Sequence, residues 1–369
     1  MSQSLVSRSF DLLDDWYLNG SRWLFEDKRA LRGAALARIL AGCSVLGILT
    51  TNFRVRDIMF GAGSVWNKPM QDQSQYAPPR LIENLGNDAF LFYYLGVMLI
   101  AVLFILGWHT RLVGPLLVIG VISIIERLPV LGDQGDNILR VGLILLVFMH
   151  TNEYWSLDAR RRARTTAKSI GRGFNGKSIA AVLKNLWNSQ FVLPRWFSNG
   201  THNIALAMLG FQLIVIYIAA GMFKVQGALW QHGTAIYYPM QSTEYKPFPF
   251  LSDLMTHFGV MVGIATYVVV FTQLFFPLML LNVITRRIAI SLVILFHLSI
   301  AVLMALPWFS LSMIAFDAIW VSTSTLVAFD LWVRGLLRPV VDLFWDVVDP
   351  IVDRLPKPSK VPAVSSEAD

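Results

Sequence analysis

Stretches of apolar residues long enough to cross the hydrocarbon core of a membrane recur along this chain. A helix rises about 1.5 Å per residue, so about 20 apolar residues cross a core of about 30 Å. We expect eight spans, at approximately residues 36–53, 88–107, 112–125, 137–150, 203–220, 258–281, 288–306 and 308–329. The third and fourth are short, and form either two crossings or a re-entrant hairpin shielded by neighbouring helices. The pattern predicts an all-α, polytopic transmembrane helix bundle of about eight spans.

The composition supports a lipid environment. Of the 369 residues, 55% are hydrophobic and 15% are charged, and the mean hydropathy is +0.55. Soluble domains carry nearer a quarter of charged residues. The net charge of +7 does not indicate nucleic acid, because the basic residues stand between apolar runs rather than on one face.

The basic residues predict an orientation. Short cytoplasmic loops hold an excess of lysine and arginine. With the N-terminus inside, most of the 31 basic residues fall on the cytoplasmic side, including the cluster at 160–164 and the pair Arg286 and Arg287. We expect a multi-pass protein of the cell membrane with both termini in the cytoplasm.

Four regions follow from this pattern. Residues 1–33 form a cytoplasmic segment with an interfacial amphipathic helix, and residues 34–330 form the transmembrane domain. After the last span, apolar residues recur at helical spacing opposite charged ones, which predicts an amphipathic surface helix over 331–355. Residues 356–369 are expected to be a disordered tail.

Polar residues inside the predicted spans are candidates for function. His297 lies nine residues before the turn at Leu306, and Asp317 lies ten residues after Pro307, so both are about 14 Å deep and able to pair. Gln212 and Gln273 have about similar depths by the same count. The four side chains either join helices by hydrogen bonds or line one polar pocket that opens to the outer face.

Lys224 is the other notable polar residue, and it follows the outer end of the fifth span, with Trp230 nearby. One interpretation is an ammonium group that reaches the interface beside an aromatic anchor. The other is a lysine whose apolar surroundings favour a neutral amine that acts as a base. The chain contains no sequence motif for ATP hydrolysis, zinc hydrolysis or a catalytic triad, and no metal site is expected.

Several stretches together resemble one family. They are Ala-Arg-Ile-Leu-Ala-Gly at 37–42, Gly-Trp-His-Thr-Arg-Leu at 107–112, Gly-Asp at 132–133, Asn-Glu-Tyr-Trp-Ser-Leu-Asp at 152–158, residues 220–233, Phe-His-Leu at 296–298 and Pro-Trp-Phe-Ser at 307–310. In this order they are similar to the horizontally transferred transmembrane (HTTM) domain family. Its relatives include vitamin K-dependent gamma-glutamyl carboxylase and bacterial proteins that mature the sporulation-delaying toxin.

The resemblance implies a chemistry. The carboxylase uses a lysine after an Ala-Gly pair to deprotonate vitamin K hydroquinone, and Lys224 matches that lysine. Trp230 and His297 fit the surrounding pattern, and menaquinone is the quinone that a bacterial member is expected to meet. Glu153 departs from the carboxylase pattern, which has histidine there. The charge-based orientation also places Glu153 inside and Lys224 outside, which conflicts with a single site that contains both.

Three functions remain open. The first is a quinol-dependent, carboxylase- or epoxidase-like enzyme that modifies a peptide or lipid at the outer face, with Lys224, His297 and Asp317 as catalytic residues and Gln212, Gln273 and Trp230 as cofactor-binding residues. The second is a non-catalytic membrane partner for the maturation or export of a secreted peptide or a small membrane protein. The third is a transporter in which His297 and Asp317 relay protons.

Overall fold

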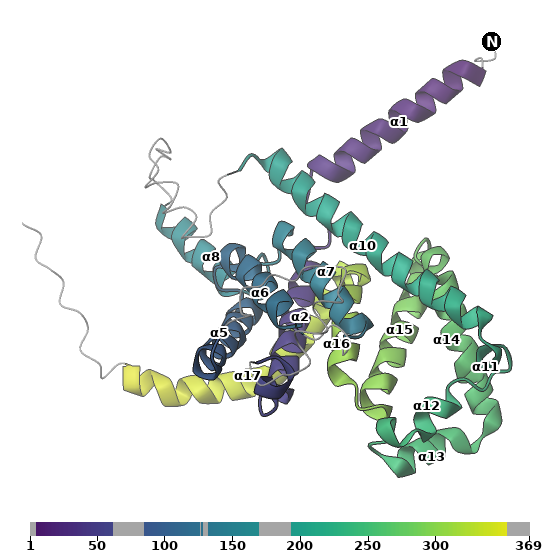
Figure 1. The fold of residues 1–369 in the computed structure, drawn as a ribbon. Coiled ribbons are helices and arrows are strands. Elements are labelled where there is room, and N and C mark those ends of the chain that lie inside the picture. The colour runs from purple at the N-terminus through teal and green to yellow at the C-terminus, as the bar shows by residue number, and fades with distance from the viewer. Residues whose placement is uncertain (1–4, 62–84, 126, 128–131, 170–192, 353–369) are drawn as a thin grey trace, which may run out of the picture. The chain divides into compact units, whose positions relative to one another are not determined.

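The computed structural model describes residues 5–61, 85–125, 127, 132–169 and 193–352, and these ranges contain helices and no strands (Figure 1). The chain divides into two compact units, residues 1–321 and 322–369. The expected all-α class is therefore confirmed.

Five helices are long and apolar enough to cross a membrane. They are α2 (Leu31–Thr51), α5 (Asn87–Leu106), α10 (Arg195–Gln226), α14 (Gly259–Met279) and α15 (Val283–Leu303). Each coincides with an expected span, and together they support a membrane protein. Helix α10 extends well beyond residues 203–220 at both ends.

The other three expected spans are not single long helices. Helices α6 (Thr110–Ile125) and α7 (Gln134–Phe148) have 16 and 15 residues, too few for a complete crossing without tilt or thinning. The expected span over 308–329 is broken into α16 (Pro307–Asp317), a 3-10 turn η4 (Ala318–Trp320) and α17 (Thr323–Val352). The break has a local cause, because the Ser322 hydroxyl accepts a hydrogen bond from the Thr325 amide and so begins a new helix. The count of about eight spans is not confirmed.

The remaining helices connect or flank the spans. They are α1 (Leu5–Phe25), α3 (Arg56–Met59), α8 (Leu157–Ser169), α11 (Ala228–Gln231), α12 (Tyr237–Gln241), the 3-10 turn η3 (Thr243–Tyr245) and α13 (Pro249–His257).

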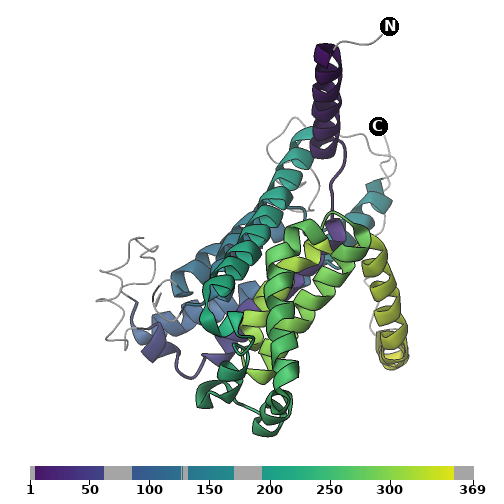
Figure 2. The ribbon, with the colours of Figure 1, turned by 90° about the vertical axis from the view of Figure 1, so that its right-hand side faces the viewer.

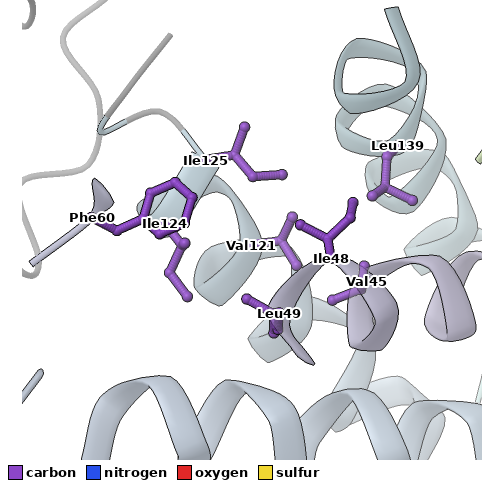
Figure 3. Close-up of a pocket in the computed structure, with 8 residues that line it drawn as sticks. All are labelled: Val45, Ile48, Leu49, Phe60, Val121, Ile124, Ile125 and Leu139. Carbon is purple, nitrogen blue, oxygen red and sulfur yellow. The ribbon is translucent and has the colours of Figure 1, made fainter. Parts of the chain in front are cut away.

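Helix α2 packs at the centre of the first unit. Its small residues permit close approach, since a Cβ on Gly47 would overlap the ring of Trp308 in α16. The Ser44 hydroxyl, 2.7 Å from the Ser312 hydroxyl, joins the same two helices. Beside α2, a small apolar cavity is lined by side chains of α2, α6 and α7 together with Phe60 (Figure 3). No polar side chain lines it, so we place no chemistry there.

Helices α10, α14 and α15 form the other side of this unit (Figures 1 and 2). A Cβ on Gly221 would lie 2.9 Å from the backbone nitrogen of Leu274, so glycine lets α10 and α14 touch by their backbones. The second unit is described to Val352, and α17 continues through Pro339 as one helix. Helix α17 begins at Thr323, before the expected boundary at 331. The expected tail at 356–369 lies outside the described residues.

Candidate functional site

Polar side chains gather near both ends of α10. Near its C-terminal end lie Lys224, Trp230 and His297, which we call the lysine cluster. Tyr217 lies seven residues before Lys224 on α10 and contacts Asp317 of α16. Near its N-terminal end, polar side chains join the start of α10 to the loop that contains Glu153. The two groups are considered in turn.

The helical repeat positions Lys224. Tyr217, Gly221 and Lys224 stand at spacings of four and three residues, so they share one face of α10. Gly221 places that face directly against α14. The half-buried Lys224 amine lies 5.1 Å from the centre of the Trp230 ring and 3.5 Å from the carbonyl oxygen of Ala220. The first contact is a cation–π interaction when the amine is protonated.

His297 lies in α15, close enough to Lys224 for their charges to interact. Its side chain is buried, its ring centre lies 5.8 Å from that of Phe309 in α16, and neither ring nitrogen has a hydrogen-bond partner among the described residues. The Ser310 hydroxyl on the next residue of α16 is likewise buried without a partner there. A buried polar group without a partner costs free energy, so unsatisfied groups in one region are typical of a binding site.

Asp317 does not form the expected pair with His297. It ends α16 instead of lying in the middle of a span, and its Oδ2 accepts a hydrogen bond of 2.6 Å from the Tyr217 hydroxyl. Both side chains are buried, and the Tyr217 ring lies 4.5 Å from that of Phe276. The Tyr217–Asp317 hydrogen bond therefore joins α10 to α16.

The two glutamines differ. Gln273 in α14 is buried, and its carbonyl oxygen has no hydrogen-bond partner among the described residues. Gln212 in α10 is half-buried. Of the four side chains expected to line one pocket, Gln273, His297 and Asp317 are therefore buried and Gln212 is not.

An apolar groove of about 450 Å³ runs between α14 and α15. Its lining includes Tyr267, Phe271 and Phe275 of α14 and Leu292 of α15. The Tyr267 hydroxyl donates a hydrogen bond of 2.8 Å to the carbonyl oxygen of Gln231, which follows Trp230. Tyr267 thus joins the lining of the groove to the segment that contains Trp230.

At the other end of α10, Asp158 organises a second polar network. Its carboxylate accepts hydrogen bonds from the backbone amides of His109 and Thr110, from the Thr110 hydroxyl, and from the side chains of Asn152 and Arg161. Burial raises the pKa of Asp158, but these hydrogen bonds and the charge of Arg161 lower it more, so the pKa lies below its usual value. Asp158 thereby fixes the start of α6 to the 152–158 segment.

Glu153 lies between α10 and α8. One carboxylate oxygen is 3.7 Å from His150 Nδ1, and the other is 3.2 Å from Arg162. Burial raises the pKa of Glu153, but the nearby His150 and the charge of Arg162 outweigh that effect, so the pKa is lowered. His150 Nε2 lies 2.7 Å from the hydroxyl of Ser198, in the first turn of α10.

The position of Ser198 shows whether Glu153 and Lys224 can share one site. Ser198 and Lys224 are 26 residues apart on the uninterrupted helix α10, which corresponds to about 39 Å. Glu153 and Lys224 therefore belong to different ends of the bundle and cannot act on one small molecule.

No family model, curated protein or solved structure matches the chain. Within the described residues, no group of three or more histidine, cysteine, aspartate or glutamate side chains could hold a metal ion.

Sequence reasoning missed Tyr217. The helical spacing could have indicated it, because Tyr217 stands seven residues before Lys224 and so lies on the same face of the helix. A tyrosine near the end of an apolar span is also typical of an interfacial anchor, which concealed this role.

Proposed function

We propose that this chain is a membrane enzyme of the HTTM type in which Lys224 acts as a base towards a lipid-soluble quinol. The observation that carries the proposal is that the Lys224 amine lies 5.1 Å from the centre of the Trp230 ring and near enough to His297, 73 residues later in the sequence, for its charge to act on the imidazole. These are the residues that the family resemblance marks.

The side chains fit a quinol. The groove between α14 and α15 is apolar and lined by aromatic rings, which suits a planar ring with an isoprenoid tail. The buried polar atoms of Gln273 and His297 have no partners among the described residues and are suited to hydroxyl groups. When bound, a quinol supplies two electrons and two ionisable hydroxyl protons.

The chain's own residues then have distinct tasks. The Lys224 Nζ accepts a proton when it is a neutral amine, a state that its apolar surroundings favour. The centre of the Trp230 ring lies 5.1 Å from the amine. Tyr217 and Asp317 hold α10 and α16 together, so they are positioning residues rather than catalytic ones.

The test is oxygen consumption by the purified chain in liposomes supplied with reduced menaquinone. We expect Lys224→Ala to abolish oxygen consumption at an unchanged protein level, since general-base catalysis contributes about 10²–10⁴-fold. Arg287→Ala removes one exposed cation elsewhere and is the matched control. Co-purifying quinone, measured by native mass spectrometry, separates loss of binding from loss of chemistry. Equal oxygen consumption by wild type and Lys224→Ala contradicts the proposal.

A second candidate is a non-catalytic partner of a secreted peptide. Exposed aromatic side chains on the segment between α10 and α14 favour it, among them Tyr238, Phe248 and Phe250. This candidate predicts that Lys224→Ala is silent in peptide maturation, while substitutions in residues 234–252 impair it.

The proposal includes the membrane placement. We propose about eight spans in the cell membrane, with α6, α7 and α16 as short membrane-embedded helices shielded by the five long ones. Both termini are cytoplasmic in this arrangement, which is supported by the distribution of basic residues.

A further inference from the structure

Four cations lie near the end of α10 opposite Lys224, and we call them the basic cluster. Lys28 precedes Arg29, whose amide donates to Asn203 of α10, and Arg111 follows Thr110, whose amide donates to Asp158. Arg162 pairs with Glu153, and Arg195 is the first residue of α10.

Lys28 lies near enough to the three arginines for their charges to act on it, and Glu153 is the carboxylate that acts in the opposite sense. Burial lowers the pKa of Lys28, Glu153 raises it, and the three arginines lower it further. Burial is the largest of these causes, and the excess of positive charge follows instead from the count, because the four cations outnumber the two carboxylates that act on them, Glu153 and Asp158.

The framework around the basic cluster is set before any ligand arrives. The Asn203 amide donates hydrogen bonds to the carbonyl oxygens of Trp23, Leu24 and Asp27, and its own oxygen accepts one from the Arg29 amide. The loop that contains Lys28 is therefore tied to α10. A preorganised group of charges binds an anion with less loss of conformational entropy.

Arg162 is fixed in a similar way. Its guanidinium donates to the carbonyl oxygen of Asn152 at 2.7 Å and to Glu153 at 3.2 Å, and its side chain is 14% exposed. Arg111 and Arg195 are exposed. The cluster thus contains one cation held by two hydrogen bonds and two exposed cations.

Helix dipoles add to the positive potential. Arg111 is the second residue of α6, and Arg195 is the first residue of α10. Helix α2 begins at Leu31, just after Lys28, and neither α2 nor α10 has a side-chain hydrogen bond at its N-cap. Helix N-termini carry partial positive charge and favour anions, most of all phosphate groups.

The surroundings of the cluster are apolar and aromatic. Next to Arg111 in the sequence are the exposed side chains of Trp108 and Leu112, and next to Arg195 are those of Trp196 and Phe197. Exposed tryptophans at the ends of apolar helices are typical of the membrane interface. An anion that binds here meets both cations and the boundary of the hydrocarbon region, which indicates an amphipathic molecule.

We propose that the basic cluster binds the phosphate group of an anionic phospholipid, with the acyl chains beside the exposed aromatic side chains. Basic pockets between membrane helices are known to hold such headgroups. Free phosphate shares the charge but gains nothing from the aromatic surroundings. This site is independent of the proposed chemistry at Lys224.

The experiment measures lipid affinity of the full chain in detergent by native mass spectrometry, with phosphatidylglycerol and phosphatidylcholine as probes. Each cation near an anionic surface contributes about fivefold in affinity. We therefore expect the double variant Arg111→Gln/Arg195→Gln to bind phosphatidylglycerol more than about tenfold more weakly, with phosphatidylcholine unchanged. The matched control Arg286→Gln/Arg287→Gln removes the same charge near the start of α15, and should change the affinity less than about twofold.

A variant that is expected to strengthen lipid binding separates the proposal from a loss of binding caused by misfolding. Glu153→Gln removes the opposing carboxylate and should strengthen phosphatidylglycerol binding. Equal losses in the two double variants would mean non-specific surface charge and overturn the proposal. Displacement of the lipid by an equal concentration of inorganic phosphate, or by an acidic peptide, would overturn it in favour of that ligand.

Discussion

The buried carboxyl group of Asp317 meets one hydrogen-bond donor among the described residues, the hydroxyl of Tyr217. Its other oxygen has no such partner. Since an unsatisfied buried group costs more than an average hydrogen bond contributes, this carboxyl group depends strongly on Tyr217.

We expect Tyr217→Phe to lower the free energy of unfolding by about 1–2 kcal/mol, because it leaves the whole Asp317 carboxyl group without a donor. Thermal unfolding in detergent measures the change. Tyr93→Phe is the matched control, because the buried Tyr93 hydroxyl oxygen has no partner in the described part of the chain. A control as destabilised as Tyr217→Phe would show that the hydrogen bond is not the cause.

The sequence predicts individual polar residues of interest, because a polar side chain within an apolar span is costly and therefore conspicuous. It found His297, Asp317 and Gln273, all of which are buried in the structure. It could not pair them, because the partner of Asp317 lies 100 residues away and pairing depends on how α10 and α16 pack.

The contact between α10 and α14 depends on a small residue, Gly221. Gly221 allows backbone contact with α14 and stands one turn before Lys224. The contact therefore sets both the packing of two spans and the position of the proposed base.

Gly221→Ala should destabilise the protein by about 1–3 kcal/mol, because its Cβ meets backbone atoms of Leu274 that have little room to move. Gly96→Ala in α5 is the control, since a Cβ there meets nothing within 4 Å, and alanine favours a helix by about 1 kcal/mol. The unfolding midpoints of the two variants should move in opposite directions. A neutral Gly221→Ala would mean that the two helices are not in tight contact.

Apolar length predicted the five long helices because each is a continuous run of about 20 residues. It failed for residues 308–329, where the run remains apolar while the backbone breaks. The break follows a local signal, the hydroxyl group of Ser322 as a helix cap, which a hydropathy pattern does not contain. The short helices α6 and α7 show a similar limit, since length alone does not reveal whether they cross.

For the molecule as a whole, the question is which end of α10 faces the cytoplasm. The basic residues of α8 lie on the same side of the bundle as the start of α10, because Arg162 contacts Glu153 and, through His150, Glu153 is connected to Ser198. The segment from α11 to α13 follows the opposite end.

Accessibility to a membrane-impermeant thiol reagent tests this orientation. In a Cys43→Ala background, which removes the only cysteine of the chain, Glu244→Cys should be labelled in intact cells. Arg160→Cys should be labelled only after the membrane is opened. The reverse pattern would contradict the predicted orientation. Labelling of both cysteines in intact cells would contradict the placement of residues 160 and 244 on opposite sides of the membrane.

Helix α10 is about 48 Å long, whereas the hydrocarbon core of a bilayer is about 30 Å thick. No proline interrupts it. A rod of this kind adjusts to bilayer thickness by tilting, and tilting moves its two ends in opposite directions. The thickness of the surrounding membrane therefore acts as a mechanical input that reaches Lys224 and Ser198 at the same time.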